Sequence, residues 1–339
     1  MSIETPVKLC VVALCAMGAG LAVAALPPPL RELPPFNPAG MMAELDAFMK
    51  KPDQPGTGKY PALKEEDPSL PEHVVYRPAN LAKLGATKLG VLAWGNGGCA
   101  DDGAGARFHL SEIASHGYLV IASGKILSGP GAPPPVPPAG AANGPAPPLP
   151  SVLPPALTRS AQLTEAINWA LKENERKGSA YYGKIDPKEV AVSGWSCGGI
   201  QALTVAKDPR VKTVVIHNSG TFPKGGTVLG EMDIGKEGLK NLHTPVIYII
   251  GGPTDIAYSN AYADFHLIDL VPVFVASSEM GHGGTFLADH GGPATAVAVS
   301  WLNWHLRGDK DAAKLFVGKD CGLCKDSYWA VDSKKLGAK

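Results

Sequence analysis

Residues 189–208 read EVAVSGWSCGGIQALTVAKD, and this stretch decides the fold. Its first part is β-rich and predicts a strand, its last part predicts a helix, and GWSCG, residues 194–198, lies between them. On a strand-to-helix turn the pattern G-x-S-x-G predicts a nucleophile elbow, with Ser196 in a strained conformation and its hydroxyl above the sheet. Both ends of the motif need glycine because side chains there would collide with neighbouring strands and the helix. The alternative is an ordinary glycine-rich turn with a capping serine.

A serine hydroxyl is a weak nucleophile, so it needs a base that is oriented by an acid. At a nucleophile elbow the three groups follow the chain order serine, acid, histidine. Residues 245–250, PVIYII, predict a buried strand, and Asp255 ends the loop GGPTD behind it. We therefore expect Asp255 to be the orienting carboxylate, with a role in an Asx turn as the alternative. Asp264 and Asp269 are rivals, but they fall in the helix that follows.

The candidate base lies behind the next predicted strand. The loop EMGHGG, residues 279–284, follows that strand and carries His282, and His290 is its competitor. No H-E-x-x-H or similar ligand spacing occurs, so no metal and no cofactor is implied. The other histidines fall on strands, helices or strand edges and are expected to pack or cap: His73, His109, His116, His217, His243, His266 and His305.

Two main-chain N–H groups are expected to form an oxyanion hole. One is that of Cys197, the residue after the nucleophile, and the other should come from a loop behind an earlier strand. WGNGG, residues 94–98, is such a loop, and we expect the N–H of Asn96 to be the donor, with Gly97 as the next candidate. The loop lacks the Lys-Ser/Thr pair of a phosphate-binding loop.

Outward from this motif, strands and helices alternate along the chain. The alternation predicts the α/β class, with a mostly parallel central sheet and helices on both faces. The expected strands are residues 73–76, 88–94, 118–123, 189–193, 211–217, 245–250 and 271–276. The expected helices are residues 40–50, 106–116, 158–177, 198–207 and 293–307.

The start of the chain has the pattern of a secretory signal peptide. Lys8 precedes an apolar run, and the small residues Ala22 and Ala24 are suited to cleavage. An uncleaved anchor is the alternative. The expected organisation is a signal peptide at 1–25, a proline-rich linker at 26–39, a single domain at 40–320 with a proline-rich loop insertion at 130–156, and a tail at 321–339.

Charge and cysteine usage narrow the possible partners and compartment. The 31 basic and 31 acidic residues balance, so nothing in the charge favours nucleic acid or an anionic membrane as a partner. In an oxidising compartment Cys321 and Cys324 predict a small disulfide in the tail. Cys99 and Cys197 are expected to be buried free thiols. The alternative is a bridge between them, if the two loops lie near the same site.

Taken together, WGNGG, IASHGYLVIAS, GWSCGG, GGPTD and GHGG resemble the α/β-hydrolase fold over residues 72–307. Within that fold the chain is similar to secreted esterases of the cutinase, PET-hydrolase, chlorophyllase and dienelactone-hydrolase group. The resemblance implies a catalytic triad of Ser196, Asp255 and His282, with Asn96 and Cys197 as oxyanion donors. It also implies that Trp195 borders the acyl site.

The expected function is that of a serine carboxylic-ester hydrolase that is secreted or periplasmic and works through an acyl-enzyme. Its substrate would be a small-molecule or polymeric ester, and the protein would act as a monomer without a cofactor. A peptidase or an acyltransferase would use the same triad. A non-catalytic binding module and a thiol oxidoreductase based on Cys321 and Cys324 are the remaining alternatives.

Overall fold

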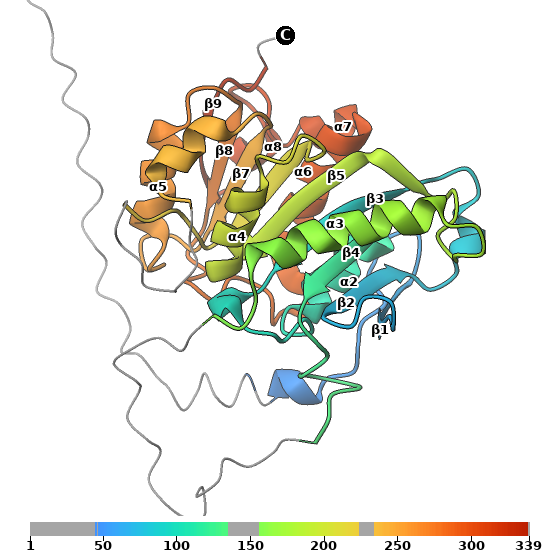
Figure 1. Cartoon of the computed structure of the whole chain (residues 1–339). Helices are drawn as coiled ribbons and strands as arrows, with labels where there is room; N and C mark the ends of the chain where they lie inside the picture. The colour runs from blue at the N-terminus through green and yellow to red at the C-terminus, as the bar shows by residue number, and fades with distance from the viewer. Residues whose placement is uncertain (1–44, 46, 135–155, 224–233, 338–339) are drawn as a thin grey trace, which may run out of the picture. The chain divides into compact units, whose positions relative to one another are not determined.

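A single sheet of nine strands organises the chain in the computed structural model (Figure 1). The structure describes residues 45, 47–134, 156–223 and 234–337, all within the unit that runs from Pro35 to Lys339. The expected signal peptide and linker, and most of the proline-rich insertion, lie outside the described residues. Of the helix expected at 40–50, residues 45 and 47–50 are described and are helical.

The strand order is β1-β2-β4-β3-β5-β6-β7-β8-β9. Pairing is parallel from β4 through β3 and on to β8, whereas β1, β2 and β9 pair antiparallel with their neighbours. The predicted α/β class with a mostly parallel sheet is thus confirmed. The strands are β1 Ala62–Glu66, β2 His73–Pro78, β3 Leu89–Gly95, β4 Tyr118–Ser123, β5 Ile185–Trp195, β6 Thr213–His217, β7 Val246–Ile250, β8 Val273–Ser277 and β9 Ala330–Lys334.

Helices cover both faces of the sheet, because strand side chains alternate between two apolar layers. Val91 of β3 belongs to an apolar cluster that includes residues of α3, α4 and α5, whereas Leu92 belongs to a second cluster that includes residues of α2 and α6. Figure 1 shows the sheet with these helices on its two sides. The described part of the chain contains no helix with the length and apolarity needed to cross a bilayer. The helices are α2 Arg107–Ser115, α3 Ser160–Glu175, α4 Cys197–Val205, α5 Tyr258–Leu267, α6 Gly292–Arg307, α7 Lys310–Ala313 and α8 Gly322–Lys325. Short 3₁₀ helices are η1 Leu81–Leu84, η2 Gly97–Cys99, η3 Lys236–Asn241 and η4 Asp289–Gly291.

The two outer strands β1 and β9 are absent from the predicted set. β9 has the sequence AVDSK and β1 has ALKEE, and in both strands most side chains remain exposed or half-buried. Neither sequence has the alternation of apolar and polar residues that is typical of a half-buried strand. The two segments are identified as strands only by their pairing, β1 with β2 and β9 with β8.

Two disulfide bonds join the four described cysteines. The Cys321–Cys324 bond confirms the prediction for the tail, but the expectation that Cys99 and Cys197 are free thiols is wrong. β3 and β5 are neighbours in the sheet, which sets Gly95 opposite Gly194 at their carboxyl ends. The loops that follow therefore meet, and the Cα atoms of Cys99 and Cys197 are 5.3 Å apart.

Candidate active site

Ser196 lies in the sharp turn between β5 and α4. Its backbone has φ 51° and ψ −118°, a conformation that non-glycine residues rarely adopt, and its N–H donates to the carbonyl of His217 at 3.0 Å. A Cβ on Gly194 would meet the main chain of Gly198, and a Cβ on Gly198 would meet that of Gly95. The strained serine and the need for glycine at both ends agree with the predicted turn.

The three residues that the sequence singles out meet at one edge of the sheet. His282 Nε2 is 3.0 Å from Ser196 Oγ, and His282 Nδ1 is 2.6 Å from Asp255 Oδ1. They come from the loops behind β5, β7 and β8, because the carboxyl ends of parallel strands share one edge. The side chain of His282 is 27% exposed, so its imidazole is accessible from solvent.

The rival residues have other partners. His290 in η4 has its Nδ1 3.5 Å from Glu112 of α2. Asp264 is buried in α5, where it accepts a hydrogen bond from the N–H of Thr221, and Asp269 accepts one from Lys334. The structure does not bring any of the three to Ser196.

Asp255 is a buried carboxylate with several donors. Besides its bond to His282, it accepts the N–H of Gly251 at 3.1 Å and that of Ala257 at 2.9 Å. Burial raises the pKa of Asp255, but these hydrogen bonds outweigh that effect and hold the pKa below its ordinary value. The carboxylate therefore stays charged at neutral pH and holds a proton on Nδ1 of His282.

Asn218 belongs to this network and is missing from the sequence prediction. It follows β6 with φ 44°, and its Nδ2 donates to Asp255 Oδ2 at 2.9 Å and to the carbonyl of Gly281 at 2.8 Å. It thereby connects the loop that carries Asp255 with the loop that carries His282. The available signal was a polar residue directly behind a buried strand, at the edge where the other site residues lie.

The two expected oxyanion donors lie next to each other. A Cβ on Gly198 would be 2.6 Å from the main-chain nitrogen of Asn96, which brings the two loops into contact. Among the described residues, no acceptor is bonded to the main-chain N–H of Asn96 or Cys197. The Asn96 side chain is engaged, because its Nδ2 donates to the carbonyls of Ala100 and Ser123. Its amide therefore holds the loop, while its N–H remains available.

Trp195 contacts both the loop that carries His282 and the loop that carries Gly97. Its indole N–H donates to the carbonyl of His282 at 2.8 Å, and a Cβ on Gly97 would collide with its ring. Its ring also packs against Phe286. Trp195 therefore supports the loop that carries His282, and neither Trp195 nor Gly97 belongs to the lining of the cavity beside Ser196.

A cavity of about 280 Å³ opens at Ser196. Ile256 lies on its rim with 81% of its surface exposed, next to Asp255 in sequence. Among the described residues that line the cavity, His282 has the only titratable side chain. The lining consists of Ser196, Cys197, Ile200, Asn218, Ser219, Gly220, Phe222, Ile256, Ala257, Asn260 and His282.

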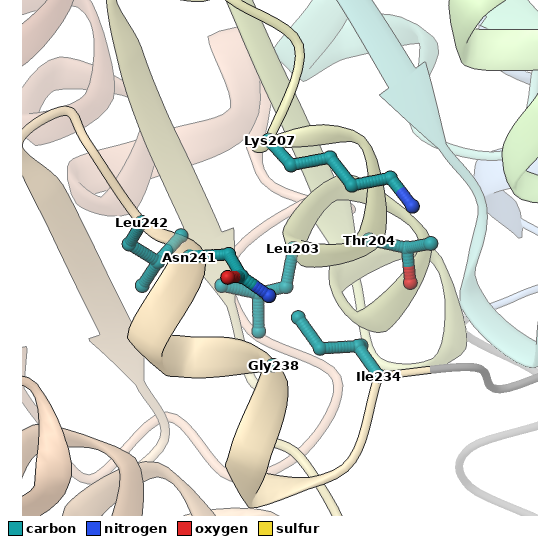
Figure 2. A pocket seen from close by; sticks show the side chains of 7 residues that line it. All are labelled: Leu203, Thr204, Lys207, Ile234, Gly238, Asn241 and Leu242. Carbon is teal, nitrogen blue, oxygen red and sulfur yellow. The ribbon is translucent and has the colours of Figure 1, made fainter.

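A second, smaller cavity lies between α4 and η3 (Figure 2). Its volume is about 90 Å³, and Leu203, Ile234 and Leu242 contribute aliphatic side chains to it. Lys207 is the charged residue at its edge. None of the predicted site residues lines this cavity, so the chemistry is associated with the one beside Ser196.

Two other histidines lie in the core beneath the site. His109 and His217 pack edge to face at 4.8 Å, and both contact the rings of Trp94 and Phe286. Burial lowers the pKa of His217 to about 3 and that of His109 well below its ordinary value. Both residues are therefore neutral packing groups, as expected from their positions on a strand and a helix.

No protein-family model and no curated protein matches the chain. The described residues contain no group of three or more His, Cys, Asp or Glu side chains placed to hold a metal ion. What the site can do is therefore inferred from its own residues and their geometry.

Proposed function

We propose that the protein is a serine carboxylic-ester hydrolase with the α/β-hydrolase fold. The observation that carries this proposal is the continuous hydrogen-bonded path from Asp255 through His282 to Ser196, with the serine on a strained strand-to-helix turn. A glycine-rich turn with a capping serine would need neither the imidazole nor the buried carboxylate. The side chain of Ser196 makes no capping hydrogen bond to α4.

The first half of the proposed reaction forms an acyl-enzyme. His282 Nε2 takes the proton of Ser196 as Oγ attacks the ester carbonyl carbon, and negative charge develops on the carbonyl oxygen. The N–H groups of Asn96 and Cys197 stabilise that charge, an effect worth about 3–4 kcal/mol for one donor in comparable sites. His282 then gives the proton to the departing alcohol.

The second half releases the acid. Water loses a proton to His282 Nε2 and attacks the acyl carbonyl, and the proton returns to Ser196 as the bond to Oγ breaks. Asp255 stays ionised throughout, because four donors around it stabilise the negative charge. It orients the imidazole and stabilises its positive form.

The cavity supports an ester that carries an uncharged, partly apolar group. Ile200, Phe222 and Ile256 contribute apolar surface, and Asn218 and Asn260 contribute polar atoms. A charged substrate group would find no opposite charge among the described residues of this lining and would lose its hydration. We propose a small-molecule or polymeric ester as the substrate, and secretion or export to the periplasm, where both disulfides would persist.

A panel of p-nitrophenyl esters with neutral acyl chains tests the proposal on the wild type and on Ser196→Ala. We expect Ser196-dependent hydrolysis, with kcat/KM lower in the variant by about 10⁴-fold or more. Both proteins should show the same thermal unfolding midpoint. Equal rates in the two proteins would refute the assignment of the site.

Peptide substrates and a competing alcohol acceptor separate the alternatives that share the triad. Cleavage of peptides at rates similar to those of esters would indicate a peptidase. Transfer of the acyl group to the alcohol in preference to water would indicate an acyltransferase. We expect neither result.

A further inference from the structure

The Cys99–Cys197 disulfide joins the two segments from which the oxyanion donors come. Cys197 is itself the residue after the nucleophile, and Cys99 lies three residues after Asn96 in η2. Both cysteines are buried, at 2% and 1% exposure. The bond therefore runs directly beside the place where the developing charge would lie.

The η2 loop has weak support of its own. Its backbone turns through positive φ at Gly98 (62°) and at Cys99 (48°), and the second value is strained for a residue with a side chain. Its two local main-chain bonds, from Cys99 to Asn96 and from Ala100 to Gly97, are both 3.2 Å long. The Asn96 side chain ties the loop to Ala100 and to Ser123 at the end of β4, but neither of these bonds reaches the turn that carries Ser196.

Contacts around Cys99 extend the connection to the helices. The carbonyl of Cys99 accepts the N–H groups of Leu157 and Thr158, just before α3. Gln201 of α4 donates to the carbonyl of Thr158 at 2.8 Å and lies 3.1 Å from Sγ of Cys99. The cysteine is thus the point at which the oxyanion loop, α3 and α4 meet.

We propose that the Cys99–Cys197 bond is a positioning element of the oxyanion hole. A disulfide holds its two Cα atoms within roughly 4.4–6.8 Å, and here they are 5.3 Å apart, so the loop cannot move away from the elbow by more than about 1–2 Å. The bond therefore keeps the Asn96 N–H and the Cys197 N–H convergent. This inference rests on the proposed esterase function.

The proposal predicts a specific kinetic signature. Misplacing one donor weakens binding of the tetrahedral state more than binding of the ground-state ester, because Asn96 does not line the cavity and Cys197 is only one of its eleven described lining residues. Loss of the bond should therefore lower kcat by about 10-fold to 100-fold, with KM changed by less than about 3-fold. The affinity for a boronic acid that forms a tetrahedral adduct on Ser196 should fall in parallel with kcat.

The test uses the full-length protein, produced under oxidising conditions, and two double variants of the bridge. Cys99→Ala/Cys197→Ala removes the bond, and Cys99→Val/Cys197→Ala removes it while filling more of the buried volume. Cys321→Ala/Cys324→Ala is the matched control, because it removes the other disulfide, which closes a turn in the tail. Circular dichroism and thermal unfolding are measured for all three.

The outcomes separate this inference from the proposed function. Reduced kcat and boronate affinity in both bridge variants, with the tail variant at wild-type values, would support it. If the wild type shows Ser196-dependent hydrolysis and a folded bridge variant keeps its kcat, only the positioning role is refuted. If the tail variant loses kcat to the same extent, a general effect of disulfide loss replaces the proposal. A wild type without Ser196-dependent hydrolysis would refute both.

Discussion

His282 and His217 both contact Ser196, yet their surroundings are opposite. His282 lies in a loop, is partly exposed and is hydrogen-bonded at both ring nitrogens. His217 ends β6 and is fully buried; its main-chain carbonyl accepts the N–H of Ser196, and neither ring nitrogen has a hydrogen-bond partner among the described residues. A main-chain contact with Ser196 would therefore not make a histidine its general base. A base needs an oriented ring, a partner for its second nitrogen and access to a proton.

The largest expected effect on kcat/KM is that of replacing His282 by leucine, compared with the same replacement at His217. His282→Leu should lower kcat/KM for a p-nitrophenyl ester by about 10⁴-fold or more, because it removes the base and acid of both half-reactions. His217→Leu should stay within about 10-fold of the wild type, since the His217 imidazole makes no hydrogen bond among the described residues and its main-chain carbonyl is kept. Steady-state kinetics of both variants provide the check. Similar losses in the two would show that the distinction is wrong.

The buried position of His217 should also make the stability of the protein depend on pH. The folded-state pKa of His217 is about 3, whereas an unfolded imidazole has a pKa of about 6.5. The contribution of His217 to the free energy of unfolding is therefore constant above pH 6.5. It declines as the pH falls toward 3, because the unfolded chain binds the proton at a higher pH than the folded chain does. The contribution of His217 at pH 4.5 is a loss of about 2–3 kcal/mol.

Urea unfolding at pH 7 and pH 4.5 measures this contribution. The wild type should lose more stability between the two pH values than His217→Leu, which has no imidazole to protonate, by about 2–3 kcal/mol. The lowered pKa of Asp255 also stabilises the folded state near neutral pH. This contribution is the same in the wild type and in His217→Leu, so it cancels when the two are compared. An identical pH dependence in the two would contradict the buried neutral state of His217.

A smaller effect is expected at the residue that supports the His282 loop. Asn218→Gly removes the donor to Asp255 and to the carbonyl of Gly281 without straining the positive φ, and should reduce kcat/KM by about 10-fold. Asn168→Ala, on the surface of α3, is the control and should leave kinetics unchanged. A wild-type rate in Asn218→Gly would show that the remaining donors hold the acid in place by themselves.

Much of the candidate site is predictable because its parts are local patterns. Ser196, Asp255 and His282 each follow a short apolar strand and each lie in a glycine-rich loop, so the sequence alone identifies them. The sheet then brings their loops together. The edge strands had no such pattern, and their pairing depends on neighbours that are distant in sequence.

Asn218 is missing from the sequence prediction, and the Cys99–Cys197 bond appears there only as the alternative to two free thiols. Asn218 matters only because β6 lies next to β7, and the bond exists only because β3 lies next to β5. The order of parallel strands in a sheet is a property of tertiary packing, and one sequence gives no direct signal for it. Two cysteines that lie 98 positions apart in the sequence are as compatible with two free thiols as with a disulfide bond.

The outer strands β1 and β9 each have a strand neighbour on one side only in the described sheet. An unpaired strand edge is a template for another chain, and charged side chains on that edge disfavour such pairing. β1 carries the partly exposed Glu65 and the exposed Glu66, and β9 carries the exposed Asp332 and the partly exposed Lys334. Both open ends of the sheet therefore present charged side chains, which disfavours edge-to-edge stacking into fibrils.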